Sequence, residues 1–278
     1  PFFAPLTDPQ LKKGMARLTT DNGSHSAVEE SGLDDANNKS GVQYSGVQFE
    51  VSTLQTLAKK FRAGFSLSLA ATRRIGQLRT DSARETAAVN VGNLAKSHLL
   101  TPGQAQSLYY SLPFFAKPPS VELLYSSVDK EFTGIGLNLE ELYTASMMSS
   151  NASLLLIQSG DFVFGAYLSH PLRVMGSGWT GSPACFLFSV TLDVKMPYHA
   201  RNPPTGADSK KPVAFLAQRD KLTIGNGDLV ITGEGRGYSN LENCYGMGLT
   251  YGSSEAACFL AGSREFVIDD VELWMIAP

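Results

Sequence analysis

The sequence GDFVFGAY, residues Gly160–Tyr167, decides the fold of this chain. It follows the apolar run SLLLI, residues Ser153–Ile157, so one strand leads into a Gly-Asp turn and a second strand leads out of it. This pattern predicts a β-hairpin. We expect Gly165 to lie where a strand tolerates no side chain, and Gly227, in the Gly-rich stretch Leu222–Gly227, to occupy a turn with positive φ.

A second informative stretch lies near the C-terminus, at Phe266–Trp274. Its apolar residues alternate in two pairs, which predicts one strand with a bulge between the pairs. We expect Trp274, at the end of this strand, to pack in the core. Glu272 has two readings: a member of a functional polar cluster, or a strand residue that faces solvent or bonds to a turn.

Short strands separated by Gly-rich turns fill the chain from residue 99 onward, with helices before and between them. This pattern predicts an α+β fold, a two-sheet antiparallel β-sandwich with flanking helices. A helical and partly flexible N-terminal extension precedes it. We therefore divide the chain into a mostly flexible polar segment (1–50), a helical extension (51–98) and the sandwich domain (99–278).

Seven segments, taken together and in this order, resemble the TLDc domain of the oxidation-resistance proteins. The series begins with a short helix and continues mainly with strands and Gly-rich turns. Its segments are Leu99–Pro113, Glu122–Ser126, Asn138–Met148, the FGAY hairpin, Gly181–Val190, Leu222–Gly227, and Gly237–Ser239 with Cys244. The family-signature residues that the resemblance singles out are Tyr125, Ser126, Gly165, Cys185, Gly225, Gly227, Glu272 and Trp274.

The resemblance implies a function as well as a fold. It implies a non-enzymatic interaction module that binds the vacuolar-type proton ATPase and regulates its assembly. Protection from oxidative stress would be the outward effect of this regulation. No cofactor is implied. The chain departs from the family pattern at Ser182–Ala184 and at Gly246–Ala261, which reads as a long connection rich in Gly, Ser and Ala.

The helical extension contains one clear amphipathic segment. Apolar residues recur every three or four positions, which places them on one helical face: Val51, Leu54, Leu57 or Ala58, Phe61 and Phe65. Lys59, Lys60 and Arg62 lie around the same helix. Three readings stay open here: a helix that packs on its own sandwich domain, a basic segment that binds an acidic partner through Phe61, Phe65 and the three cations, or an organelle presequence.

Charge and composition bound the other function classes. Residues 1–98 carry 12 basic and 9 acidic residues, and residues 99–278 carry 11 and 17, so no strongly basic face points to nucleic acid. No apolar run approaches the roughly 20 residues that a membrane span requires, which argues against direct membrane insertion. Three widely spaced cysteines favour a reducing compartment, and we expect a cytoplasmic protein that reaches a membrane or cilium only through a partner.

Candidate chemistry is sparse. The four histidines and three cysteines show no paired spacing, which argues against a metal site. Gly233–Gly237 lacks both the following helix and the Lys-Ser/Thr pair of a phosphate loop, so it reads as a hairpin turn. We expect Cys185 to be buried and Cys244, in a loop, to be the most exposed thiol and the candidate redox residue. No organised catalytic set is evident, and we expect the protein not to be an enzyme.

Two alternative functions remain. In the first, the protein is a structural component of a large cytoskeletal or ciliary assembly, and its N-terminal extension lies along neighbouring subunits. In the second, it is a redox-active enzyme that uses Cys244. Membrane association through the ATPase, co-sedimentation with microtubules, and peroxide turnover separate the three hypotheses.

Overall fold

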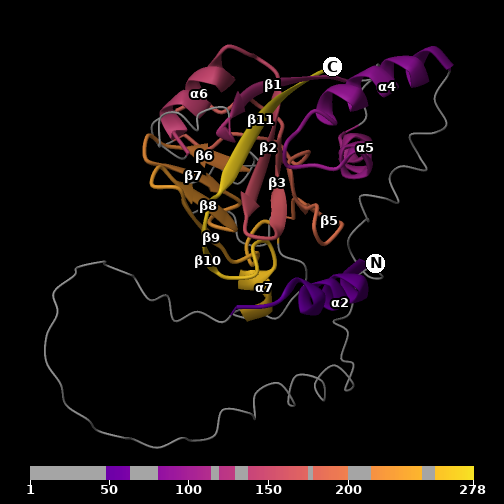
Figure 1. The fold of residues 1–278 in the computed structure, drawn as a ribbon. Helices are drawn as coiled ribbons and strands as arrows, with labels where there is room; N and C mark the ends of the chain where they lie inside the picture. Colours follow the sequence, from indigo (N-terminus) through magenta and orange to yellow (C-terminus); the bar gives the residue numbers. More distant parts are fainter. Residues whose placement is uncertain are drawn as a thin grey trace, which may run out of the picture. The chain divides into compact units, whose positions relative to one another are not determined.

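The computed structural model describes residues 48–62, 81–113, 119–128, 137–174, 178–199, 214–245 and 254–278. Tyr44–Pro278 forms one compact unit (Figure 1). The predictions for the polar segment up to residue 47 and for Phe65 lie outside the described residues, as do those for the side chains of Lys60, Phe61 and Arg62.

Six antiparallel strands form the larger sheet, in the order β1-β11-β2-β3-β4-β5. The strands are β1 (Ser120–Ser126), β2 (Ala152–Ser159), β3 (Phe162–Leu168), β4 (Phe186–Ser189), β5 (Val194–Pro197) and β11 (Asp270–Ala277). The predicted hairpin is confirmed: β2 and β3 pair from Ser153↔Leu168 to Ser159↔Phe162, and Gly160 turns the chain with φ 53°. The C-terminal strand β11 inserts between β1 and β2.

Five antiparallel strands form the second sheet, in the order β10-β9-β8-β7-β6. They are β6 (Phe215–Ala217), β7 (Lys221–Ile224), β8 (Leu229–Thr232), β9 (Arg236–Ser239) and β10 (Glu265–Val267). The Gly-rich segment after residue 232 is the turn between β8 and β9, as expected from its lack of a following helix.

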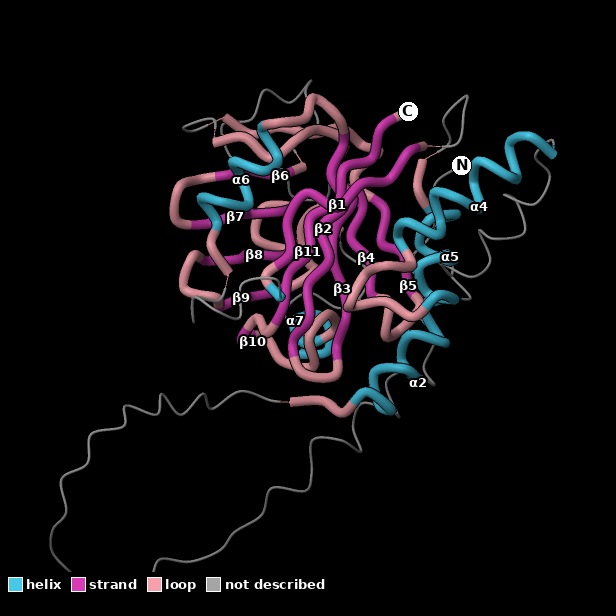
Figure 2. Tube along the Cα trace, turned by 45° about the horizontal axis from the view of Figure 1, so that its top comes forward, coloured by secondary structure: helices cyan, strands magenta, loops and turns pink. Residues whose placement is uncertain are grey.

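Two hydrophobic cores divide the unit into layers. The first lies between the sheets and joins residues such as Leu155 and Leu273 of one sheet to Leu222 and Ile231 of the other. The second lies on the opposite side of the six-stranded sheet, under α4 (Asp81–Leu94) and α5 (Pro102–Ser111). Figure 2 shows these two helices and the β6–β10 sheet on opposite sides of the β1–β5 strands. The predicted two-sheet antiparallel α+β fold is confirmed.

Local capping chemistry explains where two helices begin. At the start of α5, the Thr101 hydroxyl accepts from the Gln104 backbone N–H, and the Gln104 side chain accepts from the Thr101 N–H. This reciprocal pair is a capping box. Helix α6 (Leu139–Met147) begins after Asn138, whose side chain accepts from the N–H groups of Glu140 and Glu141.

Helix α2 (Val51–Arg62) packs on the sandwich. The side chains of Leu54 and Ala58 are fully buried in the core between the sheets. The Phe49 N–H, one turn earlier, donates to the Gly262 carbonyl at 2.8 Å. At Leu54 and Ala58, the amphipathic face of α2 therefore packs against the sandwich of the same chain. Lys59 is exposed, and its role in binding a partner stays a prediction.

The prediction of one bulged strand over Phe266–Trp274 is wrong. Phe266 belongs to β10 in the five-stranded sheet, whereas Val271 onward belongs to β11 in the six-stranded sheet. The chain crosses between the sheets at Ile268 and Asp269, and β11 then continues past Trp274 to Ala277. Apolar alternation is the same in both strands, so it does not reveal the change of sheet.

The connection at Gly246–Ala261 is also more structured than its composition predicts. Its described part contains a short helix, α7 (Ser254–Cys258), and the residues from Ala256 to Ala261 are buried. Small side chains here allow close packing, and they do not mark an exposed loop. The segment 246–253 lies outside the described residues.

Candidate functional site

Glu272 is a fully buried carboxylate on β11. Its Oε2 accepts from the Ser97 hydroxyl at 2.6 Å and from the Trp274 indole N–H at 3.0 Å, and its Oε1 accepts from the His98 backbone N–H at 2.8 Å. Ser97 and His98 lie in the connection between α4 and α5. Glu272 thus belongs to a buried polar cluster that holds the helical layer to β11, an interior strand of the larger sheet. A function of this cluster beyond holding the fold stays a prediction.

Ser126 adds a second hydroxyl beside this carboxylate. It stands directly opposite Glu272 in the β1–β11 register, so both side chains emerge on the same face of the sheet. The Ser126 Oγ is buried and makes no hydrogen bond to any described group. Tyr125, the preceding signature residue, points to the other face, where its hydroxyl accepts from the Asn138 N–H at 3.2 Å and so helps to position α6.

Asp228 is a second buried carboxylate, and the sequence patterns did not single it out. It follows Gly227 in the turn between β7 and β8. Its Oδ1 accepts from the Asn243 N–H at 2.7 Å, and its Oδ2 accepts from the N–H groups of Cys244 at 2.5 Å and Tyr245 at 2.9 Å. Three consecutive backbone donors therefore hold the 243–245 segment against the turn.

Burial governs the protonation of Asp228. It raises the pKa of this carboxyl from 3.8 to about 6, while the backbone hydrogen bonds from residues 242–245 act in the opposite direction. The same environment acts on its neighbours: burial, together with the nearby Asp228 carboxylate, raises the pKa of the Cys244 thiol to about 12. The Cys244 thiol is therefore neutral near pH 6, and the Asp228 carboxyl becomes mostly protonated below about pH 6.

Three signature glycines have physical reasons. A Cβ at Gly165 would collide with the carbonyl of Leu155 on the neighbouring strand, which confirms the expectation of a position without a side chain. Gly227 has φ 92° in open space, which confirms the positive-φ turn. Gly225 combines both requirements, because it has φ 66° and a Cβ there would meet the Tyr245 ring.

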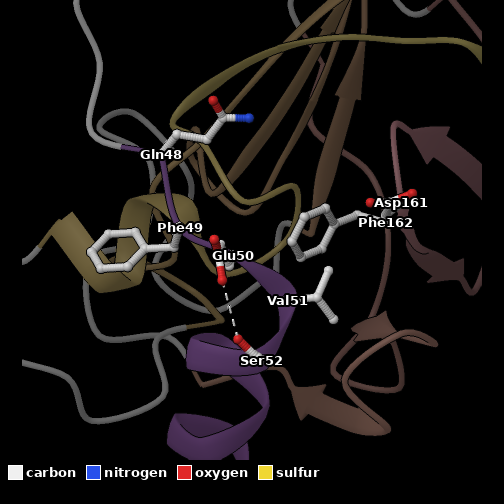
Figure 3. A pocket seen from close by; sticks show the side chains of 7 residues that line it. All are labelled: Gln48, Phe49, Glu50, Val51, Ser52, Asp161 and Phe162. Atoms are coloured by element: carbon white, nitrogen blue, oxygen red, sulfur yellow. Dashed lines mark hydrogen bonds between the residues drawn. The ribbon is translucent and has the colours of Figure 1, made fainter.

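An open surface pocket lies between the start of α2 and the β2–β3 turn (Figure 3). Its lining includes the apolar side chains of Phe162 and Val51, which lie close together, and the carboxylates of Glu50 and Asp161. Gly262 makes this arrangement possible, because its φ of 76° and its missing side chain leave room for the Phe162 ring. The pocket is thus acidic and aromatic in character.

A comparison with protein-family models identifies the fold. The family model described as the TLDc domain matches residues 93–277, about two thirds of the chain. The chain belongs to the TLDc family. The matched range begins within α4 and includes Ser97, Asp228 and Glu272, so both buried carboxylates and their partners are parts of the TLDc domain. A search of the curated proteins finds no significant match.

Within the TLDc domain, the predicted burial of two signature residues is confirmed. Trp274 lies in the core beneath α4 and α5, and Cys185 is buried at the start of β4. The expectation that Cys244 is the most exposed thiol is wrong. The Cys244 side chain is fully buried, and those of Cys185 and Cys258 are only 1% and 2% exposed. A redox role for Cys244 stays a prediction, and burial with a raised pKa disfavours it.

Within the described ranges of the chain, no three His, Cys, Asp or Glu side chains gather in a group able to hold a metal ion. None of the helices in those ranges combines the length and the apolar character that crossing a membrane requires.

Sequence reasoning missed the two residues that complete the buried sites, Ser97 and Asp228. Ser97 carries no local signal, because its partner Glu272 lies 175 residues away. Asp228 does carry one: it stands at the end of a Gly-Asn-Gly turn, where a carboxylate commonly bonds to backbone N–H groups. The signal places Asp228 in a turn, but it does not reveal that the 243–245 segment supplies the donors.

Proposed function

We propose that the protein is an interaction module without a catalytic step of its own, which binds a vacuolar-type ATPase and regulates its assembly. Protection from oxidative stress is then an outward effect of that regulation. The observation that carries the proposal is the TLDc match over residues 93–277, on a two-sheet fold that agrees with it. The protein would act in the cytoplasm and associate with membranes through the ATPase.

A preorganised scaffold supports a binding role. Glu272 holds the α4–α5 connection to the interior strand β11, and Asp228 holds the 243–245 segment to the β7–β8 turn. Helix α2 is anchored through Leu54 and Ala58. Surfaces held in this way lose little conformational freedom when a partner binds, so more of the contact energy is retained as affinity.

The test is a native affinity capture with the full-length tagged chain, from cells that contain the ATPase. The proposal expects ATPase subunits in the captured material. Gly165→Ala, which disrupts the domain fold at the β2–β3 pair, provides the matched control and should recover none. Failure of the wild-type chain to recover any ATPase subunit would count against the proposal.

Two other outcomes support the alternatives. Co-sedimentation with microtubules, without ATPase subunits, favours a structural component of a cytoskeletal or ciliary assembly. Turnover of hydrogen peroxide by the purified chain, abolished by Cys244→Ser, favours a redox enzyme. The buried position of Cys244 makes the second outcome the less expected one.

A further inference from the structure

The outward face of the β6–β10 sheet carries two rows of side chains. The first row crosses all five strands in register, through Leu216, Thr223, Val230, Tyr238 and Glu265. The second row consists of Lys221, Thr232, Arg236 and Val267. Side chains opposite one another on neighbouring strands lie about 5 Å apart, so each row is a continuous surface strip. We call the two rows together the outer face.

The outer face remains partly exposed, in contrast to the corresponding face of the other sheet. On the six-stranded sheet, outward residues such as Leu154 and Trp274 are buried beneath α4 and α5. On the outer face, Leu216 and Val230 are only partly buried and lie outside both core clusters, and Val267 is 59% exposed. The other residues of the two rows are polar or aromatic, so Leu216, Val230 and Val267 add apolar surface to an otherwise mixed face.

Tyr238 forms the aromatic centre of the outer face. The Arg264 guanidinium donates to its hydroxyl at 2.5 Å and lies 4.9 Å from the ring centre. This contact holds a tyrosine and an arginine in fixed positions at the surface. Tyrosine and arginine are the residues most enriched among those that dominate binding energies at protein interfaces.

The two rows of the outer face carry two basic side chains and one carboxylate. Lys221 and Arg236 belong to its second row and Arg264 borders it, whereas Glu265 is the one carboxylate of the two rows. Glu242 and Glu265 act electrostatically on Arg264 and balance part of its charge. Residues 99–278 as a whole carry 11 basic and 17 acidic residues. The excess of basic side chains on this face therefore fits an acidic partner segment.

We propose that the outer face is the docking surface for an acidic segment of a partner protein that carries at least one large apolar side chain. The apolar side chain packs against Val230 and Tyr238, and the carboxylates meet Lys221 and Arg236. This inference rests on the proposed interaction function and names the surface through which it operates.

The test is site-specific photocrosslinking with the full chain in cells. A photoreactive amino acid replaces Val267 on the outer face or, as a control of matched exposure, Val89 on α4, which is 62% exposed. Crosslinked peptides are then sequenced by mass spectrometry. The proposal expects the Val267 position to give a partner peptide rich in Asp and Glu, and the Val89 position to give no such peptide.

The outcomes separate this inference from the proposed function. An acidic peptide from a protein other than the ATPase supports the docking surface and contradicts the ATPase proposal. ATPase subunits captured without any crosslink from Val267 support the ATPase proposal and overturn the docking surface. A crosslink to a basic segment, or to a second copy of this chain alone, also overturns it.

Charge reversal provides a second, quantitative test of the docking surface. Lys221→Glu with Arg236→Glu should reduce partner capture about tenfold or more at physiological salt, because like charges then face each other. The control, Lys96→Glu with Arg173→Glu, changes the same net charge at exposed sites outside the two rows and should leave capture within about twofold. Equal losses in the two double variants would mean that net charge alone determines binding and would overturn the proposal.

Discussion

The Ser97 hydroxyl donates to the Glu272 carboxylate at 2.6 Å, although 175 residues separate them in sequence. Both residues are buried, and the same carboxylate also accepts from the Trp274 indole and the His98 backbone. A buried charge is tolerated only when donors surround it, so each of these contacts supports the others. The contact joins the helical layer to β11, an interior strand of the larger sheet.

Replacement of Glu272 by Leu should therefore be strongly destabilising. The Ser97 hydroxyl, the His98 N–H and the Trp274 N–H would all lose their acceptor, and each unsatisfied buried group costs about 1–3 kcal/mol. We expect the free energy of unfolding to fall by at least about 3 kcal/mol in urea denaturation followed by circular dichroism. The control is Glu122→Leu on the exposed side of β1, which should stay within about 0.5 kcal/mol of wild type.

Local patterns predicted the elements whose partners are near in sequence. The GD turn predicted β2 and β3, and the apolar periodicity from Val51 predicted α2. The pairing of distant segments was not predictable in this way. Nothing in the alternation of Phe266–Trp274 distinguishes a bulge from a crossing between sheets, because both give the same apolar spacing.

The two buried carboxylate sites also depend on contacts between segments that are distant in sequence, which local patterns do not predict. Burial of Trp274 was predictable from its apolar strand, whereas the donors that surround Glu272 come from a connection between helices far along the chain. Exposure of Cys244 was inferred from its position in a loop. The loop is held inward by the three backbone bonds to Asp228, a contact that only the tertiary fold creates.

Gly165→Ala should be the most damaging glycine substitution in the sheet. An added Cβ would collide with the Leu155 carbonyl and lie 2.9 Å from the Phe188 ring, so the β2–β3–β4 pairing must shift. We expect a loss of about 3 kcal/mol or more. In contrast, Gly92 lies in α4 with open space around it, and Gly92→Ala should stabilise by about 0.5–1 kcal/mol. Thermal melts of the two variants should move in opposite directions.

Asp228 should make stability fall as the pH rises toward neutrality. Burial raises the pKa of this carboxyl to about 6 in the folded state, against 3.8 unfolded, so the folded protein binds the proton more tightly. The resulting stabilisation is present below about pH 4 and is lost as the pH rises through about 6. Its full size is about 3 kcal/mol, from 1.36 kcal/mol per pKa unit.

The measurement is the difference in unfolding free energy between wild type and Asp228→Asn from pH 4 to pH 7. Asn cannot titrate in this range, so wild type should lose stability relative to the variant as the pH rises. The exposed Asp220→Asn serves as the control and should run parallel to wild type. Parallel curves for Asp228→Asn would show that burial does not raise this pKa.

The three cysteines should resist modification in the folded protein. Their side chains are buried, and burial raises the pKa of the Cys244 and Cys258 thiols, so little thiolate is present at pH 7. Thiolate is the reactive form. We expect maleimide labelling to be at least about a hundredfold slower in buffer than in urea. Rapid labelling of Cys244 in the native state would restore the case for a redox residue.

Leu54→Ala tests whether α2 packs on the TLDc domain in solution. Leu54 is fully buried in the core between the sheets, and truncation of a buried leucine costs about 2–5 kcal/mol. Gln55→Ala, at the exposed neighbouring position of the same helix, should change stability by about 0.5 kcal/mol or less. A Leu54→Ala melt that matches wild type would mean that α2 is free of the domain, and its amphipathic face would then be available to a partner.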